Sequence, residues 1–222
     1  MEILHRDSLV RGGFAGLTET RLIKDNKIGG DNSTWNGIGN FTYLADARYL
    51  PHGETHMHPH KEVDVITIML EGRLSHEGSL KDGQSMVANQ VQVQRAGGEG
   101  FEHNEVNPDS SGTRLLQLWA LPETAGEPAD YKFYQLESNE LMRIYGGNKY
   151  QSQTFDSHTV IEVGLLSKHK IVTKKGQYLA YISNGEAQIN GVTVTDGDLI
   201  RGTDFDFIVL SDELHLTLIS VE

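Results

Sequence analysis

Short strand-like segments separated by turns run along the whole chain, and they constrain its fold more than any other feature. The segment Val63–Leu70 reads V-D-V-I-T-I-M-L and is β-branched or apolar at nearly every position, which is typical of a strand buried on both faces. Leu115–Leu121 has the same character. The pairs Asn190-Gly191 and Asp196-Gly197 are typical of β-hairpin turns. The sequence therefore predicts an all-β fold, with further strands over 41–50, 87–94, 159–165, 177–183, 187–189, 192–194, 199–200, 205–210 and 214–221.

One polar segment divides this series of strands. Residues 122–129 read P-E-T-A-G-E-P-A, which combines two prolines with few apolar side chains and is typical of a linker. A chain of 222 residues is long enough for two domains. We therefore expect an N-terminal domain over 1–121, a linker over about 122–129, and a second β-barrel or sandwich over 130–222.

Composition narrows the classes of partner. The chain has 19 basic and 31 acidic residues, so its net charge is −12, which repels phosphate backbones and anionic lipid. There is no cysteine, so a metal ion would have to be held by nitrogen and oxygen. No uninterrupted apolar stretch approaches the length of a membrane span or a signal sequence. We expect a cytoplasmic protein with no direct contact to nucleic acid or membrane.

Three histidines stand at a spacing of two in the segment T-H-M-H-P-H. In an extended chain, His56, His58 and His60 point to the same face, which suits a metal ion. Pro59 fixes its own backbone angle and favours an extended His58. The alternative is a solvated histidine-rich loop without a ligand.

A second pair at the same spacing follows the glycine-rich turn Gly97–Gly100. If a barrel brings His103 and Glu105 to face His58 and His60, the four side chains form a site for a divalent first-row metal. Two further residues stay open as participants. Glu62 shares the face of His58 and His60 in a regular strand, and His56 either caps the site or faces water.

These segments resemble the pirin family of the cupin superfamily. The family motifs correspond here to His58-Pro59-His60 with Asp64, to Ala96-Gly97 with Gly100–Glu105, and to Leu116–Trp119. The resemblance implies a bicupin: a metal-bearing first barrel, a linker, and a second cupin-like barrel without a metal motif. It also implies His58, His60, His103 and Glu105 as ligands of one divalent ion. Fe²⁺ is the favoured ion, with Ni, Mn, Cu or Zn as alternatives.

The chain departs from the usual family pattern at two places. The first motif continues as Lys61-Glu62-Val63-Asp64 instead of Arg-Gly-Phe-Glu, and the glycine-rich turn contains one glycine more than the commoner form. Arginine and lysine are not equivalent in binding geometry, and groups around the ligands tune a metal. The departures therefore bear on metal preference and substrate contacts, whereas the fold expectation is unaffected.

The resemblance implies a metal-dependent dioxygenase similar to quercetin 2,3-dioxygenase, acting on a flavonol or similar aromatic with dioxygen. Glu105 would then be both ligand and catalytic proton acceptor. Candidate residues for an apolar substrate wall are Phe41, Tyr43, Val63, Val65, Ile66 and Leu116. The alternative is a metal-binding regulatory protein, such as a transcriptional cofactor, that acts through a protein partner because its acidic charge disfavours direct contact with DNA.

Overall fold

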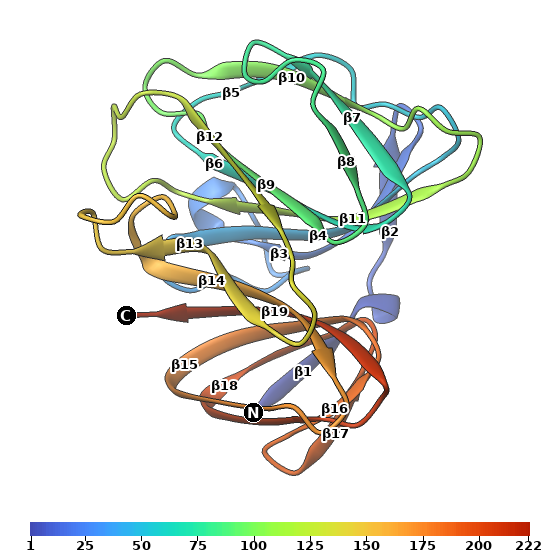
Figure 1. Cartoon of the computed structure of the whole chain (residues 1–222), viewed down its shortest axis with the longest axis vertical. Coiled ribbons are helices and arrows are strands. Elements are labelled where there is room, and N and C mark those ends of the chain that lie inside the picture. The colour runs from blue at the N-terminus through green and yellow to red at the C-terminus, as the bar shows by residue number, and fades with distance from the viewer. The chain divides into compact units, whose positions relative to one another are not determined.

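A computed structural model describes residues 1–222 and confirms the predicted all-β fold (Figure 1). The chain forms two compact units. The central unit comprises Val10–Gln135, and the terminal unit comprises Met1–Leu9 together with Leu136–Glu222. The helical segments are two short 3-10 turns, η1 (Arg6–Ser8) and η2 (Asn26–Ile28). Neither is long or apolar enough to cross a membrane.

The central unit contains two antiparallel sheets. The larger sheet has the strand order β12-β9-β6-β11-β4-β3-β2, and the smaller has the order β5-β10-β7-β8. The strands are β2 (Arg11–Phe14), β3 (Leu17–Lys24), β4 (Phe41–Tyr49), β5 (His58–His60), β6 (Asp64–Glu71), β7 (Arg73–Gly78), β8 (Ser85–Val87), β9 (Gln90–Arg95), β10 (Phe101–Val106), β11 (Thr113–Ala120) and β12 (Asp130–Gln135).

The terminal unit is built on one sheet with the order β13-β14-β19-β15-β18-β16-β17, and β1 adds to β18. Its interior is a continuous apolar cluster that includes Tyr178, Phe205 and Phe207. The strands are β1 (Glu2–His5), β13 (Leu141–Gly147), β14 (Ser157–Ser167), β15 (Ile171–Asn184), β16 (Glu186–Ile189), β17 (Val192–Thr195), β18 (Asp198–Val209) and β19 (Glu213–Val221).

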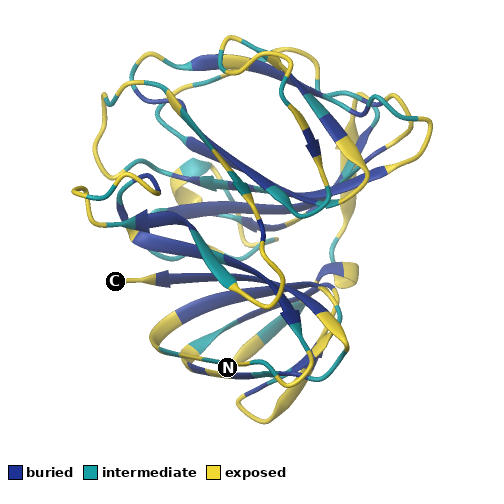
Figure 2. Cartoon of the chain, viewed as in Figure 1, coloured by how far each residue is buried: buried dark blue, intermediate teal, exposed yellow.

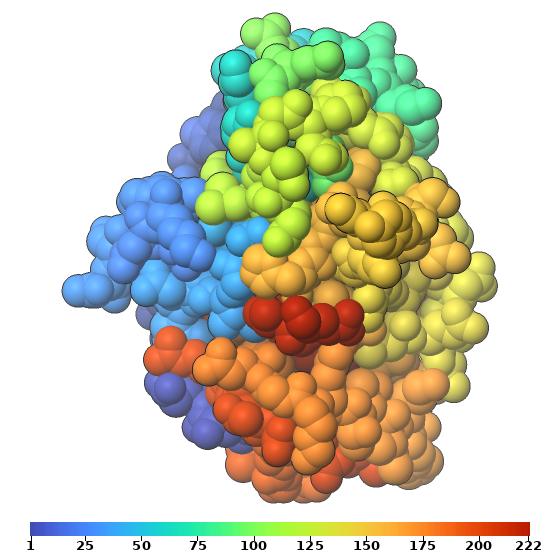
Figure 3. Space-filling model, turned by 90° about the vertical axis from the view of Figure 1, so that its left-hand side faces the viewer, coloured from blue at the N-terminus to red at the C-terminus, as the bar shows by residue number.

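The unit boundaries differ from the expected division into 1–121 and 130–222. Residues 130–135 form β12, which pairs with β9 and so belongs to the central unit. The first residues belong to the terminal unit because Glu2–His5 pairs antiparallel with β18. Figure 3 shows this N-terminal segment, in dark blue, against the orange-red strands of the same unit. Long-range strand pairing sets these boundaries, and the composition of a segment does not report it.

The two predicted hairpin turns behave differently. The Asn190-Gly191 turn joins the paired strands β16 and β17, as predicted. The Asp196-Gly197 turn joins β17 to β18, but these strands are not neighbours, because β16 lies between them in the sheet. This turn is held by other contacts: Gly197 donates its N–H to Ile182 O and accepts from Arg6 N. Asp198 Oδ2 also accepts from Thr195 N.

Small side chains between two large ones on one face of β4 leave space inside the central unit. Tyr43, Ala45, Ala47 and Tyr49 alternate along the strand, so they point to one face with two small side chains between two large ones. All four are buried (Figure 2). The cavity described below is lined by three of them, Tyr43, Ala47 and Tyr49, and the small side chain of Ala47 leaves room between the two tyrosines.

Candidate metal centre

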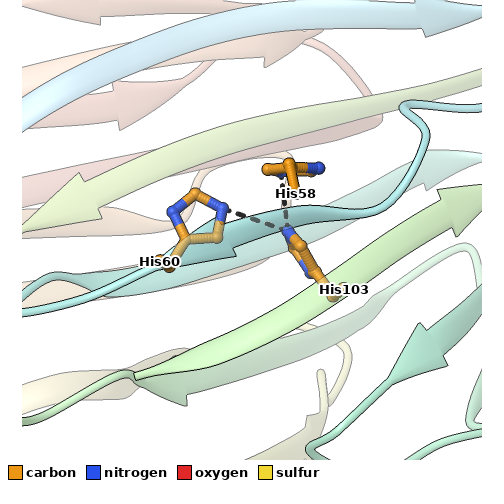
Figure 4. A group of neighbouring side chains, drawn as sticks. All are labelled: His58, His60 and His103. Carbon is orange, nitrogen blue, oxygen red and sulfur yellow. Dashed lines mark hydrogen bonds between the residues drawn. The ribbon is translucent and has the colours of Figure 1, made fainter. Parts of the chain in front are cut away.

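Three histidines from two strands of the smaller sheet converge on one point. His58 and His60 stand on β5, and His103 stands on β10 (Figure 4). His103 Nε2 lies 3.1 Å from His58 Nε2 and 3.1 Å from His60 Nε2. Each of the three residues offers one ligand nitrogen, and these nitrogens all lie within 4.8 Å of one another. The predicted meeting of the two histidine segments is therefore present in the fold.

Strand pairing explains why the rings meet. β5 and β10 pair antiparallel, with His58 opposite His103 and His60 opposite Phe101. Residues 58 and 60 share a face because strand side chains alternate, and His103 is their cross-strand neighbour. On its other side β10 pairs with β7, where Gly78 lies opposite His103. A Cβ at Gly78, whose φ is +147°, would lie 2.1 Å from Glu102 O, so only glycine permits this close approach.

The nitrogen spacing fits a first-row metal ion. Two ligand nitrogens at about 2.1 Å from one ion, at tetrahedral or octahedral angles, lie about 3.0–3.4 Å apart. The two Nε2 separations of 3.1 Å are in this range. The cluster is thus compatible with a divalent metal bound by imidazole nitrogen.

Hydrogen bonds on the other ring nitrogens leave the Nε2 lone pairs available. His58 Nδ1 lies 2.8 Å from His56 O, and a carbonyl only accepts, so Nδ1 carries the proton. His76 Nδ1 lies 3.3 Å from Lys81 O and is protonated for the same reason. His76 Nε2 therefore accepts, and it faces two donors, Gln94 Nε2 at 3.0 Å and His103 Nδ1 at 3.3 Å. This assignment leaves Nε2 of both His58 and His103 unprotonated, as a metal ligand must be.

Burial keeps two of these imidazoles neutral. The pKa of His60 is lowered to about 4, first by burial and then by His58. The pKa of His103 is lowered to about 2, first by burial and then by the neighbouring histidines. At neutral pH both rings are therefore uncharged, so a metal ion does not have to displace a proton from them.

Glu105 lines the same cavity but is not in the histidine cluster. Its Oε2 accepts from the Tyr49 hydroxyl at 3.0 Å. Its Oε1 accepts from Thr67 Oγ1 at 2.8 Å and from Gln92 Nε2 at 3.2 Å. Each carboxylate oxygen has two lone pairs, so these bonds orient Glu105 and leave it further acceptor capacity.

Neither of the two residues left open by the sequence joins the cluster. Glu62 has a positive φ of 52°, which ends the regular extended chain beyond β5, and its carboxylate accepts from Gly126 N. His56 has a φ of 62° and is exposed, with Nδ1 3.6 Å from Glu54 Oε2. His56 acts through its backbone, since its carbonyl holds the His58 ring. Asp64 is buried, and its Oδ1 lies 3.7 Å from Arg95 Nε.

A cavity of about 350 Å³ opens beside the histidines inside the central unit, a volume suited to a small molecule. Of the expected apolar wall residues only Tyr43 lines it. Phe41, Val65, Ile66 and Leu116 are buried in the core instead, and Val63 packs against the cluster of Val65, Ala96 and Phe101. The sequence analysis did not identify Glu19, Arg21, Tyr49, Leu115, Gln117 and Trp119 as lining residues.

His76 and Gln92 were also missed. Both are fully buried polar side chains, His76 on β7 and Gln92 on β9. Their alternation with apolar neighbours was a usable signal: Leu74 precedes His76 by two residues and is buried as well. A polar residue on a buried strand face needs a partner, and here the partners are His103 and Glu105.

Comparison with known proteins identifies relatives of this chain. Residues 26–120 match the pirin family model. An 81-residue segment is 42% identical to a Zymomonas mobilis protein that carries a provisional name of quercetin 2,3-dioxygenase, covering 36% of this chain and 34% of that protein. A quercetin 2,3-dioxygenase of Escherichia coli is 27% identical over 149 residues, which are 64% of each chain. The matched segments thus span between about a third and two thirds of these relatives.

Solved structures extend the likeness in fold over nearly the whole chain. The crystal structure of a bacterial pirin from E. coli in complex with nickel(II) superposes with a TM-score of 0.85 at 19% identity, over 99% of this chain and 98% of that one. A quercetin 2,3-dioxygenase from Acinetobacter baumannii gives a TM-score of 0.75 at 19% identity, over 100% and 86%. The segment 26–120, which matches the pirin family model, contains all three histidines of the cluster.

Proposed function

We propose that this protein is a metal-dependent dioxygenase that acts on a flavonol or a similar planar aromatic, with His58, His60, His103 and Glu105 around one divalent ion, iron(II) being favoured. The observation that carries the proposal is the convergence of three Nε2 atoms at the wall of a 350 Å³ cavity. The names of the relatives, quercetin 2,3-dioxygenases among them, support the reaction class.

The donor set fits the proposed ion. The three clustered imidazole nitrogens, with the Glu105 carboxylate lining the same cavity and no thiolate in the chain, suit iron(II), nickel(II) and other borderline first-row ions. When bound, such an ion would supply Lewis acidity toward the oxygens of the substrate and a path for electrons between substrate and dioxygen.

The residues of the chain have separate tasks in this reaction. The cavity places an aromatic substrate against the histidines. Glu105 accepts the proton that the hydroxyl of the substrate loses. Its carboxylate is aimed by Tyr49, Thr67 and Gln92. The pKa of Tyr49 is raised well above its usual value, first by burial and then by Glu105, so Tyr49 remains a donor.

Oxygen uptake tests the proposal. Iron(II)-loaded wild-type protein should consume dioxygen in proportion to the quercetin lost, and His60→Ala should show only the background rate. Glu105→Gln should retain most of its metal, measured by elemental analysis, and lose about 10²–10⁴-fold in rate, the range for a general base. Glu71→Gln is the matched control, because Glu71 is an exposed carboxylate at the end of β6. Equal background uptake by wild type and His60→Ala would overturn the enzyme proposal for this substrate.

A further inference from the structure

A second polar cluster lines the cavity, and it comes from the larger sheet of the central unit. Glu19 and Arg21 alternate on β3 and Tyr43 stands on β4. Glu19 Oε2 accepts from the Tyr43 hydroxyl at 2.9 Å, and Glu19 Oε1 accepts from Arg21 Nε at 2.7 Å. Glu19 is only 6% exposed, so this carboxylate faces the cavity and little bulk water.

Aromatic rings connect this cluster to the histidines. The Trp119 ring stacks on Tyr43 with centroids 4.4 Å apart and an interplanar angle of 21°. The other neighbour of Trp119 is His60, whose ring centroid lies 5.7 Å away in an edge arrangement. The cavity lining therefore includes the His60 ring, the Trp119 ring that contacts it, the Tyr43 ring stacked on Trp119, and the buried Glu19 carboxylate bonded to Tyr43. A planar aromatic molecule suits a cavity lined by aromatic rings and a few polar groups.

The chemistry of the cluster favours a ligand that donates a hydrogen bond. Burial, and then the Glu19 charge, raise the pKa of Tyr43, so its hydroxyl keeps its proton and donates to Glu19. The Tyr43 oxygen also has a hydrogen bond with Arg21, so the available acceptor is the Glu19 carboxylate, whose Oε2 accepts from Tyr43 and retains a second lone pair. An incoming O–H group finds a charged acceptor there, and hydrogen bonds to charged groups are the stronger kind.

A purely structural ion pair is the simpler explanation of Glu19 and Arg21, but the surroundings do not match it. An ion pair that stabilises a fold is covered by neighbours that complete its hydrogen bonds. In this pair the Glu19 side chain is 6% exposed, but the Arg21 side chain is 48% exposed. Here the residues opposite on β4 are Ala47, paired with Glu19, and Ala45, paired with Arg21. These small side chains leave the carboxylate at the cavity wall, where a ligand can reach it.

We propose that Glu19 and Tyr43, with Arg21 holding the carboxylate, form a subsite that binds a phenolic hydroxyl at the far end of a planar aromatic substrate. This inference rests on the proposed function, because the near end of that substrate lies at the histidines. The substrate class is thereby narrowed to polycyclic or linked phenols whose distal ring carries an O–H donor. Aromatics without a distal hydroxyl leave Glu19 buried without a partner from the ligand, and they bind less tightly.

Binding under anaerobic conditions tests the subsite without turnover. The probes are quercetin and 3-hydroxyflavone, which share the 3-hydroxyl and 4-carbonyl group but differ in their distal hydroxyls. Dissociation constants are measured by absorbance titration of nickel(II)-loaded protein. Wild type should bind quercetin at least about tenfold more tightly than 3-hydroxyflavone. In Glu19→Gln and Tyr43→Phe this ratio should fall toward one, with the affinity for 3-hydroxyflavone little changed.

Matched controls separate the subsite from general damage. Glu71→Gln and Tyr150→Phe make the same chemical changes at exposed positions outside the cavity and should keep the wild-type ratio. An equal ratio in wild type, Glu19→Gln and Tyr43→Phe would overturn the subsite. Tighter binding of quercetin than of 3-hydroxyflavone, without oxygen uptake, would support the subsite and contradict the proposed reaction. Oxygen uptake with equal affinity for the two flavonols would support the reaction and contradict the subsite. If neither flavonol binds, 2-naphthol and naphthalene are titrated against the same variants, and equal affinities again overturn the subsite.

Discussion

The two units of this chain use antiparallel sheets in opposite ways, and the contrast is clearest in one strand from each. In β19 of the terminal unit, Leu214, Leu216 and Leu218 alternate into a continuous apolar cluster. In β10 of the central unit, the corresponding alternation places His103 and Glu105 inside. This face of β19 packs in a hydrocarbon cluster, whereas this face of β10 lines a cavity with side chains that can bind protons and metals.

This difference shows what a buried polar residue requires. Buried apolar side chains stabilise a fold wherever they pack, whereas each buried polar group must find a partner or destabilise it. The central unit meets this requirement through networks: His103 with His76, and Glu105 with Tyr49, Thr67 and Gln92. We expect the metal content and the stability of the central unit to depend on its metal ligands and on pH. We expect the stability of the terminal unit to depend on the volume of the side chains in its apolar cluster.

The largest expected effect is the loss of metal from the central unit. His103→Ala removes the imidazole whose Nε2 lies 3.1 Å from both of its neighbours, so bound metal should fall to background in elemental analysis of protein purified without chelators. His158→Ala removes an exposed histidine from β14 of the terminal unit and should leave the metal content unchanged. Equal metal content in the two variants would contradict the proposed centre.

Acidification should affect the two units unequally in metal-free protein. His60 and His103 have folded pKa values of about 4 and about 2, below the value near 6.5 of an unfolded chain. The unfolded state therefore binds more protons below about pH 6.5, and stability falls as the pH drops from there toward 4 and below. Hydrogen exchange should show β5 and β10 losing protection at a higher pH than β15 and β19. Loss of protection at the same pH in both units would contradict the expected difference in their response to acid.

A smaller effect is expected when the group behind His103 is changed. His76→Phe leaves His103 Nδ1–H without its acceptor, and metal affinity should fall about 10–100-fold, as is usual for partners of metal ligands. Competition with a chromophoric chelator measures the change. His76→Gln retains an acceptor in its amide oxygen and should recover part of the affinity. Unchanged affinity in His76→Phe would show that the hydrogen bond does not position His103.

The smallest effect compares two alanines. Ala180 is fully buried in the apolar cluster of the terminal unit, so Ala180→Val should overpack it and lower the free energy of unfolding by about 1–3 kcal/mol. Ala47 lies at the cavity wall, so Ala47→Val has room and should cost less than about 1 kcal/mol while weakening quercetin binding. Urea unfolding and flavonol titration measure both. Equal destabilisation would show that the cavity does not accept the added methyl groups.

Local sequence patterns were sufficient for much of the secondary structure. The β-branched segment at 63–70 became β6, and the segments at 41–50 and 115–121 became β4 and β11, each within two or three residues. The segments at 199–200 and 205–210 were predicted separately but form one strand, β18. The intervening Arg201–Asp204 is polar and largely exposed, so it has a strand backbone without the apolar pattern of a buried strand.

The candidate site was predictable where its residues are close in sequence. The spacing of His58 and His60, and of His103 and Glu105, predicts shared strand faces because side chains alternate. The partners of these residues could not be predicted in the same way. His76 stands 27 residues from His103, and Glu19 stands 24 residues from Tyr43, so their contacts depend on which strands become neighbours.

The sequence by itself determined the all-β class, the short histidine motifs and the nitrogen and oxygen chemistry available to a metal, because alternation and composition are local properties. The tertiary structure alone decided that the three Nε2 atoms meet, that Glu62 and His56 stay outside the cluster, and that β1 joins the terminal unit. It also decided that the small side chain of Ala47 lies at the wall of a cavity that Glu19 lines as well. These outcomes depend on strand order and register, which are set by packing over the whole chain and are not encoded in any one segment.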